Sequence, residues 1–312
     1  MASAPPPRAS SKSATALGIG AVALWCWSGP CFAAGSGAMG SMPYLSASCA
    51  VGVATAMLYH KSLGRALGDL FRLPFRAAAM GFLGMSVYTV LLAYAIGMAP
   101  EKDQAQVVLV NYLWPIGIVL FGLLLLDEKP RAGLTVGGAA LGFGGVLVAR
   151  GAETFTAAPS SLVPHALALL GAAFWALYSV LLRRWRIPEE KSGSTLGFIL
   201  CGLLAAAVAS VQGDWSRAAQ ARALDWLWVA FLGIGPIGLA YYWWEIGIKR
   251  GAANLIAVTA YFIPIVSALL MGLFFRESLS PGLPYGAAMI AAGAWIGRLA
   301  SRYPAAAKPA AE

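Results

Sequence analysis

Apolar residues recur along this chain in unbroken runs of roughly 18 to 22 positions, separated by short polar segments. A helix of that length crosses the hydrocarbon core of a bilayer. A membrane β-barrel would instead show strict alternation of apolar and polar positions, which these runs lack. The pattern predicts an all-α polytopic membrane protein with ten transmembrane helices, at roughly 15–35, 42–60, 76–98, 105–126, 132–150, 164–183, 194–212, 226–247, 254–275 and 282–300.

Composition agrees with this prediction. Of the 312 residues, 59% are hydrophobic and 11% are charged, compared with about 25% charged residues in a typical soluble domain. No sizeable soluble domain is therefore expected. Residues 1–13 and 304–312 are rich in Pro, Ser and Ala, and we expect both to be disordered cytoplasmic tails. The four cysteines lie inside apolar runs without the spacing of metal ligands, so packing is expected for them.

The net charge of +9 comes from basic residues in the short gaps between the apolar runs. When the N-terminus is placed inside, 17 of the 22 Lys and Arg residues fall on the inner side of the membrane. Cytoplasmic loops carry such an excess, so both termini are predicted to be cytoplasmic. The basic surplus therefore indicates topology, and no nucleic-acid partner is expected.

The fourth apolar run, Asn111–Glu128, reads NYLWPIGIVLFGLLLLDE and opens with polar and helix-breaking residues. Pro115 removes a backbone donor and should kink the helix, which a membrane helix tolerates where the break is buried in protein or faces water. Asn111, Trp114 and Ile118 share one helical face. This face is predicted to line a hydrated cavity, and the alternative for Asn111 is a hydrogen bond that only joins two helices.

The same pattern returns 149 residues later, where Tyr261–Glu277 reads YFIPIVSALLMGLFFRE. Other residues recur at nearly the same offset, among them Trp25 and Trp175. Two halves, 14–150 and 151–303, therefore hold five spans each. Because five is odd, the second half must enter the membrane upside down, as in the inverted repeats of many secondary transporters, whose substrate site lies between the repeats. The alternative is a duplicated scaffold without transport.

Glycines within the spans predict how the helices pack and bend. The pairs Gly138–Gly142 and Gly293–Gly297 have the GxxxG spacing that lets two membrane helices approach closely. Gly233–Gly238 reads GIGPIG, but it lacks the strand and the acidic residue that a dinucleotide-binding motif requires. Together with Pro236, these glycines predict a kinked eighth span.

The segments Pro115–Glu128 and Pro264–Glu277, which end the fourth and ninth spans, make the chain similar to the drug/metabolite transporter (DMT) superfamily in its ten-helix, EamA-type form. The sequence NYLWP at Asn111–Pro115, with tryptophans in the first and sixth spans, resembles the YddG-type exporters of aromatic amino acids. The resemblance implies a basket of spans one, three, four, six, eight and nine around a central cavity, with spans five and ten as a side scaffold. Glu128 and Glu277 are expected to fix the turn into the next helix.

Aromatic residues with a polar group recur at mid-span positions, where a role as interfacial anchors is a poor explanation. We expect them to line the cavity, where they would stack on a flat apolar side chain and attract an ammonium group. Asn111, Ser28 and backbone groups freed at Pro115 are expected to bind a carboxylate. The predicted substrate-binding residues are Trp25, Ser28, Tyr88, Asn111, Trp114, Trp175, Tyr178 and Tyr242.

Two prolines and one carboxylate complete the candidate site. Pro115 and Pro264 are predicted to shape gates that the repeat relates to each other. Glu245 is the only carboxylate placed within a span, which favours a role in ion coupling. The alternative is an ion pair near the inner edge of the membrane with Lys249, four residues later.

The predicted function is export of aromatic or other large neutral amino acids across the bacterial inner membrane by alternating access. The alternatives are an exporter of drugs or other metabolites such as lipophilic cations and, outside transporters, an intramembrane enzyme. The sequence has no HExxH, GxSxG or P-loop pattern, so we expect neither an enzyme nor a cofactor. The expected partners are the small-molecule substrate and the lipid bilayer. A monomer is compatible with the sequence, which does not define the oligomeric state.

Overall fold

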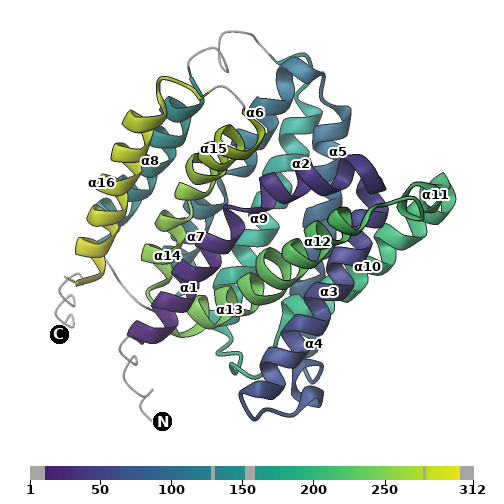
Figure 1. Ribbon diagram of the computed structural model, residues 1–312. Helices are drawn as coiled ribbons and strands as arrows, with labels where there is room; N and C mark the ends of the chain where they lie inside the picture. Colours follow the sequence, from purple (N-terminus) through teal and green to yellow (C-terminus); the bar gives the residue numbers. More distant parts are fainter. Residues whose placement is uncertain (1–10, 128–130, 152–158, 277–278, 303–312) are drawn as a thin grey trace, which may run out of the picture.

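The computed structural model describes residues 11–127, 131–151, 159–276 and 279–302, and all regular elements in these ranges are helices (Figure 1). The predicted all-α membrane fold is confirmed, since nine helical spans within the described residues are long and apolar enough to cross a bilayer. The tenth is α16, whose apolar stretch Leu283–Gly297 is shorter.

The spans lie within a few residues of their predicted positions, although half of them consist of two or three consecutive helices. Single helices form five spans: α3 (Ser41–Ser62), α8 (Ala132–Arg150), α9 (Val163–Arg184), α10 (Gly193–Gln212) and α16 (Leu283–Arg302). The composite spans are α1 and α2 (Lys12–Trp25, Ser28–Met39); α4, η2 and α5 (Phe75–Gly81, Phe82–Val87, Tyr88–Met98); α6 and α7 (Glu101–Asn111, Trp114–Leu125); α12, η4 and α13 (Ala223–Leu232, Gly233–Leu239, Ala240–Arg250); and α14 and α15 (Ala253–Thr259, Phe262–Phe275). Short helices η1 (Leu67–Leu70) and α11 (Trp215–Ala218) lie in connections.

Some predictions concern residues at the edges of the described ranges. α1 begins at Lys12, inside the predicted N-terminal tail. Residues 1–10 of that tail, the predicted C-terminal tail 304–312, and both Glu128 and Glu277 lie outside the described residues.

The prediction that Glu245 is the only carboxylate within a span is wrong. Because α6 and α12 begin earlier than predicted, Asp103 and Asp225 lie in the first turns of these helices and are buried. The backbone N–H of Ser160 donates to Asp103 Oδ2 (2.8 Å), and that of Arg222 donates to Asp225 Oδ2 (2.8 Å). A carboxylate in the first turn is also stabilised by the positive end of the helix dipole. Asp225 therefore caps its own helix, whereas Asp103 joins α6 to the connection before α9.

The predicted kinks are present in the fourth, eighth and ninth spans. α7 begins after a two-residue break and carries Pro115 in its first turn, where the missing N–H sacrifices no helical hydrogen bond. Pro264 has the corresponding place in α15, after the break that follows α14. Pro236 lies in the π-helical turn η4, and the third span contains a π-helical turn, η2, at the corresponding place. These paired irregularities support the inverted repeat.

The spans pack as two bundles. The α9 bundle consists of α4, η2, α5, α6, α7 and α9, and the α13 bundle consists of α1, α2, α12, η4, α13, α14 and α15. α10 packs on η2 of the α9 bundle, α3 packs on η4 of the α13 bundle, and α3 and α10 also contact each other. Each bundle thus takes spans from both halves of the sequence. The repeat, which relates spans one, three and four to spans six, eight and nine, exchanges one bundle for the other.

Close backbone contacts through glycine join helices of the α13 bundle to one another and to α3. A Cβ atom added to Gly247 of α13 would lie 2.7 Å from the Cα of Gly18 in α1. A Cβ on Gly238 of η4 would lie 2.9 Å from the carbonyl oxygen of Gly52 in α3. Side chains at these positions would force the helices apart.

α8 and α16 lie side by side at one edge of the molecule (Figure 1). A Cβ atom added to Gly138 would lie 2.7 Å from the carbonyl oxygen of Gly293, and one added to Gly145 would lie 2.6 Å from that of Gly286. Helices can approach this closely only where both lack side chains at the contact. The predicted packing of the fifth and tenth spans as a side scaffold is therefore confirmed.

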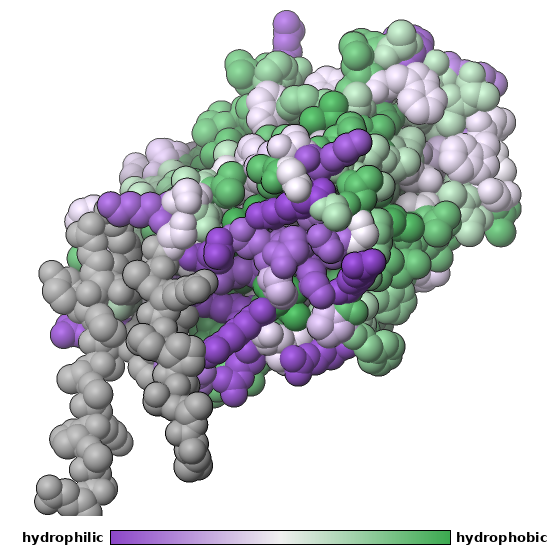
Figure 2. Space-filling model, turned by 90° about the horizontal axis from the view of Figure 1, so that it is seen from below, coloured by the Kyte–Doolittle hydropathy of each residue, from purple (hydrophilic) through white to green (hydrophobic). Residues whose placement is uncertain are grey.

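One end of the molecule has a hydrophilic surface. We call the end where α1 begins and α16 ends, at the bottom of Figure 1, the terminal end, and the opposite one the far end. Viewed from below, the terminal end presents a concentration of hydrophilic residues among apolar surroundings (Figure 2). The chain segments that meet there include Arg65, Arg72, Arg183, Lys191 and Lys249.

Candidate functional site

Four tryptophans meet at the interface between the two bundles. Trp114 and Trp175 come from the α9 bundle, and Trp25 and Trp244 come from the α13 bundle. The ring centroids of Trp175 and Trp244 are 5.7 Å apart in a stacked arrangement, and those of Trp25 and Trp114 are 6.5 Å apart, edge to face. Tyr241 completes this tryptophan cluster, with its ring 4.8 Å from Trp25 and 5.5 Å from Trp175. Such aromatic pairs are worth about 0.5–1.5 kcal/mol each beyond area burial.

Two indole N–H groups of the cluster have hydrogen-bond acceptors, one in a helix irregularity and one in a serine side chain. Trp25 Nε1 donates to the carbonyl oxygen of Pro236 (3.0 Å), which lies in the π-helical turn η4. Trp244 Nε1 donates to Ser179 Oγ (3.2 Å), and that hydroxyl donates to the carbonyl oxygen of Trp175 (3.0 Å). The first bond joins α1 to η4 within the α13 bundle, and the second joins α13 to α9 across the interface.

Asn111 and Tyr88 form a polar corner beside the cluster. The Asn111 side-chain amide donates to the Tyr88 hydroxyl (3.3 Å), and the Tyr88 ring is stacked on Trp175 with centroids 6.3 Å apart. Asn111 is 7% exposed, and its Oδ1 atom has no hydrogen-bond partner among the described residues. A buried carbonyl oxygen without a donor is unfavourable, so this atom is ready to accept a hydrogen bond from a ligand.

The prediction of a hydrated cavity on the face of Asn111, Trp114 and Ile118 is not met in this conformation. All three side chains are buried, and Trp114 and Ile118 belong to the central hydrophobic core. The tryptophan rings contact one another across the bundle interface, as described above, and occupy the space that a substrate would need. A substrate could enter only if the bundles moved or the rings rotated.

The other predicted site residues lie at different depths. Ser28 is half-buried at the start of α2, after the break that follows Trp25. Pro115 and Pro264 are buried at the first turns of α7 and α15. Tyr178 stacks obliquely on Trp175, but its hydroxyl points away from the cluster to Glu245.

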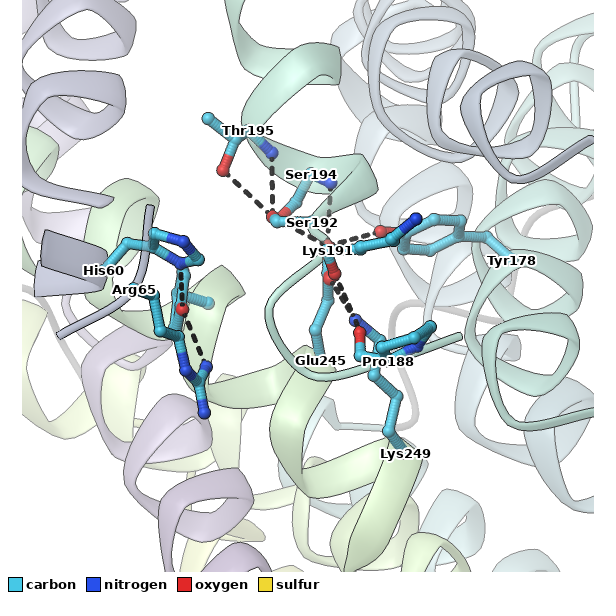
Figure 3. Close-up of polar contacts among 11 residues, drawn as sticks. His60, Arg65, Tyr178, Pro188, Lys191, Ser192, Ser194, Thr195, Glu245 and Lys249 are labelled. Atoms are coloured by element: carbon cyan, nitrogen blue, oxygen red, sulfur yellow. Dashed lines mark hydrogen bonds and ion pairs between the residues drawn. The ribbon is translucent and has the colours of Figure 1, made fainter. Parts of the chain in front are cut away.

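Glu245 lies in a buried polar network at the terminal end (Figure 3). Its Oε1 atom accepts from the Tyr178 hydroxyl (2.5 Å), the Ser194 backbone N–H (2.7 Å) and the Ser192 hydroxyl (3.2 Å). Its Oε2 atom pairs with Lys249 Nζ at 2.9 Å. The predicted ion pair is therefore present, but both side chains are almost fully buried, at 2% and 3% exposed, and do not lie at a solvated edge.

Tyr242 belongs to a second polar group, which contains His60 and Arg65 (labelled in Figure 3), and not to the tryptophan cluster. His60 Nε2 lies 3.1 Å from the carbonyl oxygen of Ala66, which requires a proton on that nitrogen. His60 Nδ1 therefore accepts from the Tyr242 hydroxyl (2.7 Å), which in turn accepts from Arg65 (3.1 Å). Arg65 also pairs with Glu189 at 2.9 Å.

The sequence prediction missed several residues that build these sites. Tyr241 and Trp244 occupy the cluster instead of Tyr242, although all three belong to the run YYWWE. A register shift of one residue turns a helical side chain by about 100°, and η4 immediately before this run changes the register. Ser192 was recognisable from the local sequence as a helix N-cap, because serine is favoured at that position. In the structure it is the N-cap of α10 and accepts from the backbone N–H of Thr195.

Comparison with known proteins decides the family. A model of the EamA-like transporter family matches residues 163–297. The chain is 32% identical over 298 residues to the aromatic amino acid exporter YddG of Ancylobacter novellus, covering 94% of this chain and 99% of that relative. The chain belongs to the EamA-like transporter family.

Two further similarities cover nearly the whole chain of this transporter. It is 29% identical over 305 residues to the aromatic amino acid exporter YddG of Salmonella typhimurium, covering 94% of this chain and 99% of that one. A solved crystal structure superposes with a TM-score of 0.79 at 31% identity, covering 93% of this chain and 99% of that one. The predicted membership of the drug/metabolite transporter superfamily is confirmed, and the protein is a multi-pass membrane protein of a bacterial transporter family.

Proposed function

We propose that this EamA-like transporter exports aromatic and other large neutral amino acids across the inner membrane by alternating access. The observation that carries the proposal is the tryptophan cluster on the interface between two bundles that the repeat exchanges. Secondary transporters with inverted repeats bind substrate at such an interface near the bilayer midplane. The similarity to proteins named aromatic amino acid exporters supports the same substrate class.

The terminal end is proposed to face the cytoplasm. Its surface is hydrophilic in Figure 2, and the sequence segments that join the spans on the predicted inner side, together with the two terminal segments, hold 17 of the 22 basic residues. Positive charge is retained on the cytoplasmic side during membrane insertion. Substrate would therefore enter from the terminal end and leave through the far end.

The chemistry of the cluster suits a zwitterion with an aromatic side chain. Tryptophan faces stack on a flat apolar group and attract an ammonium group, each effect being worth about 0.5–2 kcal/mol. The unpaired Oδ1 atom of Asn111 offers a hydrogen-bond acceptor beside them. We therefore assign Asn111 to the ammonium group of the substrate, whereas the sequence alone suggested its carboxylate. Ser28 and the backbone at the break before Pro115 remain the proposed carboxylate partners.

The two helix breaks are proposed to act as gates. Pro115 and Pro264 lie at the first turns of α7 and α15, one in each bundle. Breaks of this kind concentrate bending at one point, so a bundle can open on one side of the membrane while it stays closed on the other.

Counterflow in proteoliposomes tests the substrate assignment. Purified protein should exchange labelled phenylalanine without added nucleotide, and phenethylamine should compete while 3-phenylpropionate, which lacks the ammonium group, should not. Asn111→Leu should weaken phenylalanine exchange about tenfold, because one hydrogen bond to a charged group is lost. Competition by 3-phenylpropionate alone would overturn the role given to Asn111.

A matched pair of tryptophan variants tests the location of the site. Trp175→Ala should abolish most of the exchange, since it removes a ring that contacts three other members of the cluster. Trp226→Ala is the control, because Trp226 is 47% exposed at the start of α12. Equal exchange by the two variants would remove the tryptophan cluster from consideration as the substrate site.

Lipophilic cations are the second candidate substrate, favoured by the same aromatic rings and by the acceptor on Asn111. A quaternary ammonium dye has no N–H group, so its transport should be insensitive to Asn111→Leu. Transport of such dyes without amino acid exchange would replace the substrate assignment but not the transporter family.

A further inference from the structure

The closure of the terminal end rests on contacts that cross from one bundle to the other. The last two turns of α13 lie against the end of α9 and against the loop 185–192 that leads into α10. For substrate to reach the tryptophan cluster from this end, α13 must separate from both. The polar contacts along this boundary therefore set how readily the terminal end opens, provided that the proposed alternating access holds.

Glu245 is the centre of the boundary. It lies on α13, whereas Tyr178 lies on α9 and Ser192 and Ser194 lie at the start of α10. Three of its four hydrogen-bonding partners thus belong to the opposite side, and its fourth, Lys249, is its own helical neighbour. The Ser194 N–H comes from the first turn of α10, where the helix dipole also favours a carboxylate.

Two cations strengthen the same boundary. Lys249 Nζ donates across it to the carbonyl oxygens of Lys191 (2.6 Å) and Pro188 (3.4 Å). Arg183 at the end of α9 donates to the carbonyl oxygens of Ile248 (3.0 Å) and Gly251 (2.8 Å), which end α13. A cation at a helix C-terminus satisfies carbonyl groups that have no partner within the helix.

The corresponding positions in the third span carry no such groups. At the 150-residue offset that relates Trp175 to Trp25, Glu245 corresponds to Ala95 and Lys249 corresponds to Ala99. Ala95 and Ala99 are buried, and they pack with Val107 and Ala168 inside their own α9 bundle. The far end thus has apolar contacts within a bundle where the terminal end has a charged network between bundles.

We propose that Glu245 acts as a lock of the terminal end, which means that its hydrogen bonds across the boundary hold the two bundles together there. The lock makes the two conformations of the transporter unequal in energy. The conformation closed at the terminal end keeps Glu245 fully hydrogen-bonded. Opening this end removes three of its partners together and exposes the pair with Lys249 to water. Because the repeat places Ala95 and Ala99, and no charged pair, at the corresponding positions in the described part of the chain, the resting transporter favours the conformation that is closed at the terminal end.

Distances between spin labels across the terminal end test the proposal. Lys12→Cys in α1 and Phe75→Cys in α4 place one exposed label on each bundle, and the four native cysteines are buried. In substrate-free protein in nanodiscs, the parent should show one dominant short distance. Tyr178→Phe, which removes one donor to Glu245, should lower the ratio of short to long distances about tenfold. Glu245→Gln should shift the same ratio further.

Tyr242→Phe is the matched control. Both tyrosine hydroxyls are buried at the terminal end, but Tyr242 binds His60 and Arg65 and is connected to Glu189 across the boundary only through Arg65, so its loss should change the distances less. A larger shift for Tyr178→Phe than for Tyr242→Phe supports the lock, and equal or absent shifts overturn it. Because no substrate is present, the result is independent of the amino acid assignment, which the counterflow experiment tests by itself.

Discussion

The two ends of this transporter are related by the repeat and yet are held together differently. At the terminal end, a carboxylate and two cations join the bundles through buried hydrogen bonds. At the far end, α2 packs with α12 and α15 inside one bundle, and α5 and α6 pack with α9 inside the other. The comparison teaches that an inverted repeat need not make its two ends equivalent, since the charged residues Glu245 and Lys249 at one end correspond to Ala95 and Ala99 in the other half.

The largest expected effect is in cysteine labelling, which tests which end of the protein faces the cytoplasm. Single cysteines at Lys102 and Arg217, exposed at the far end, should react with an impermeant thiol reagent in intact cells. A cysteine at Phe75, exposed at the terminal end, should react only after the membrane is permeabilised. The contrast should be all-or-none. The reverse pattern would invert the orientation, and with it the direction proposed for transport.

Removal of the buried carboxylate should have the next largest effect. Glu245→Ala leaves Lys249 buried without its counter-ion, and breaking such a pair costs about 3–5 kcal/mol. Thermal unfolding in detergent should therefore show a clear fall in Tm. Replacing both residues with leucine should recover much of the loss, because no unpaired charge then remains.

An exposed ion pair at the same end provides the control for this prediction. Arg184 pairs with Asp127 at 2.9 Å, but the two side chains are 45% and 85% exposed. Asp127→Asn should leave Tm nearly unchanged, since exposed pairs contribute about 0–1 kcal/mol. A comparable loss for Asp127→Asn and Glu245→Ala would show that burial is not what distinguishes the network.

Replacing a glycine with alanine should change the stability by a smaller amount, and the change should differ between the two ends. A Cβ atom on Gly247, near the terminal end, would lie 2.7 Å from the backbone of Gly18, so Gly247→Ala should destabilise the protein by about 1–3 kcal/mol. Gly37 of α2, near the far end, has no atom within 4 Å of an added Cβ. Gly37→Ala should therefore be neutral or slightly stabilising by helix propensity. Similar Tm values for the two variants would contradict the close contact of α1 with α13.

Much of the fold was predictable from the sequence because the relevant signals are local. The helix breaks near Pro115 and Pro264 and the irregular eighth span at Pro236 follow from a missing backbone N–H, wherever the segment packs. The pairing of Trp25 with Trp175 at the centre was likewise visible as a 150-residue repeat, and their rings lie 5.8 Å apart.

The composition of the site was only partly predictable, because it depends on register and on partners distant in sequence. Tyr242 was chosen for the cluster, but the helix that follows the π-helical turn presents Tyr241 and Trp244 to it. Glu245 was recognised as unusual, but its donors Tyr178 and Ser194 are 67 and 51 residues away. No pattern near Glu245 indicates that these donors meet it.

The sequence by itself determined the number and position of the spans, their breaks, the inverted repeat and the basic bias of one end. Each of these follows from hydrophobicity, proline chemistry and charge, which act on a segment regardless of its neighbours. The tertiary structure alone decided that each bundle mixes spans from both halves, that tryptophans fill the interface, and that Glu245 joins α13 to α9 and α10. These features depend on which helix faces meet, and a buried charge is tolerated only where distant donors converge on it.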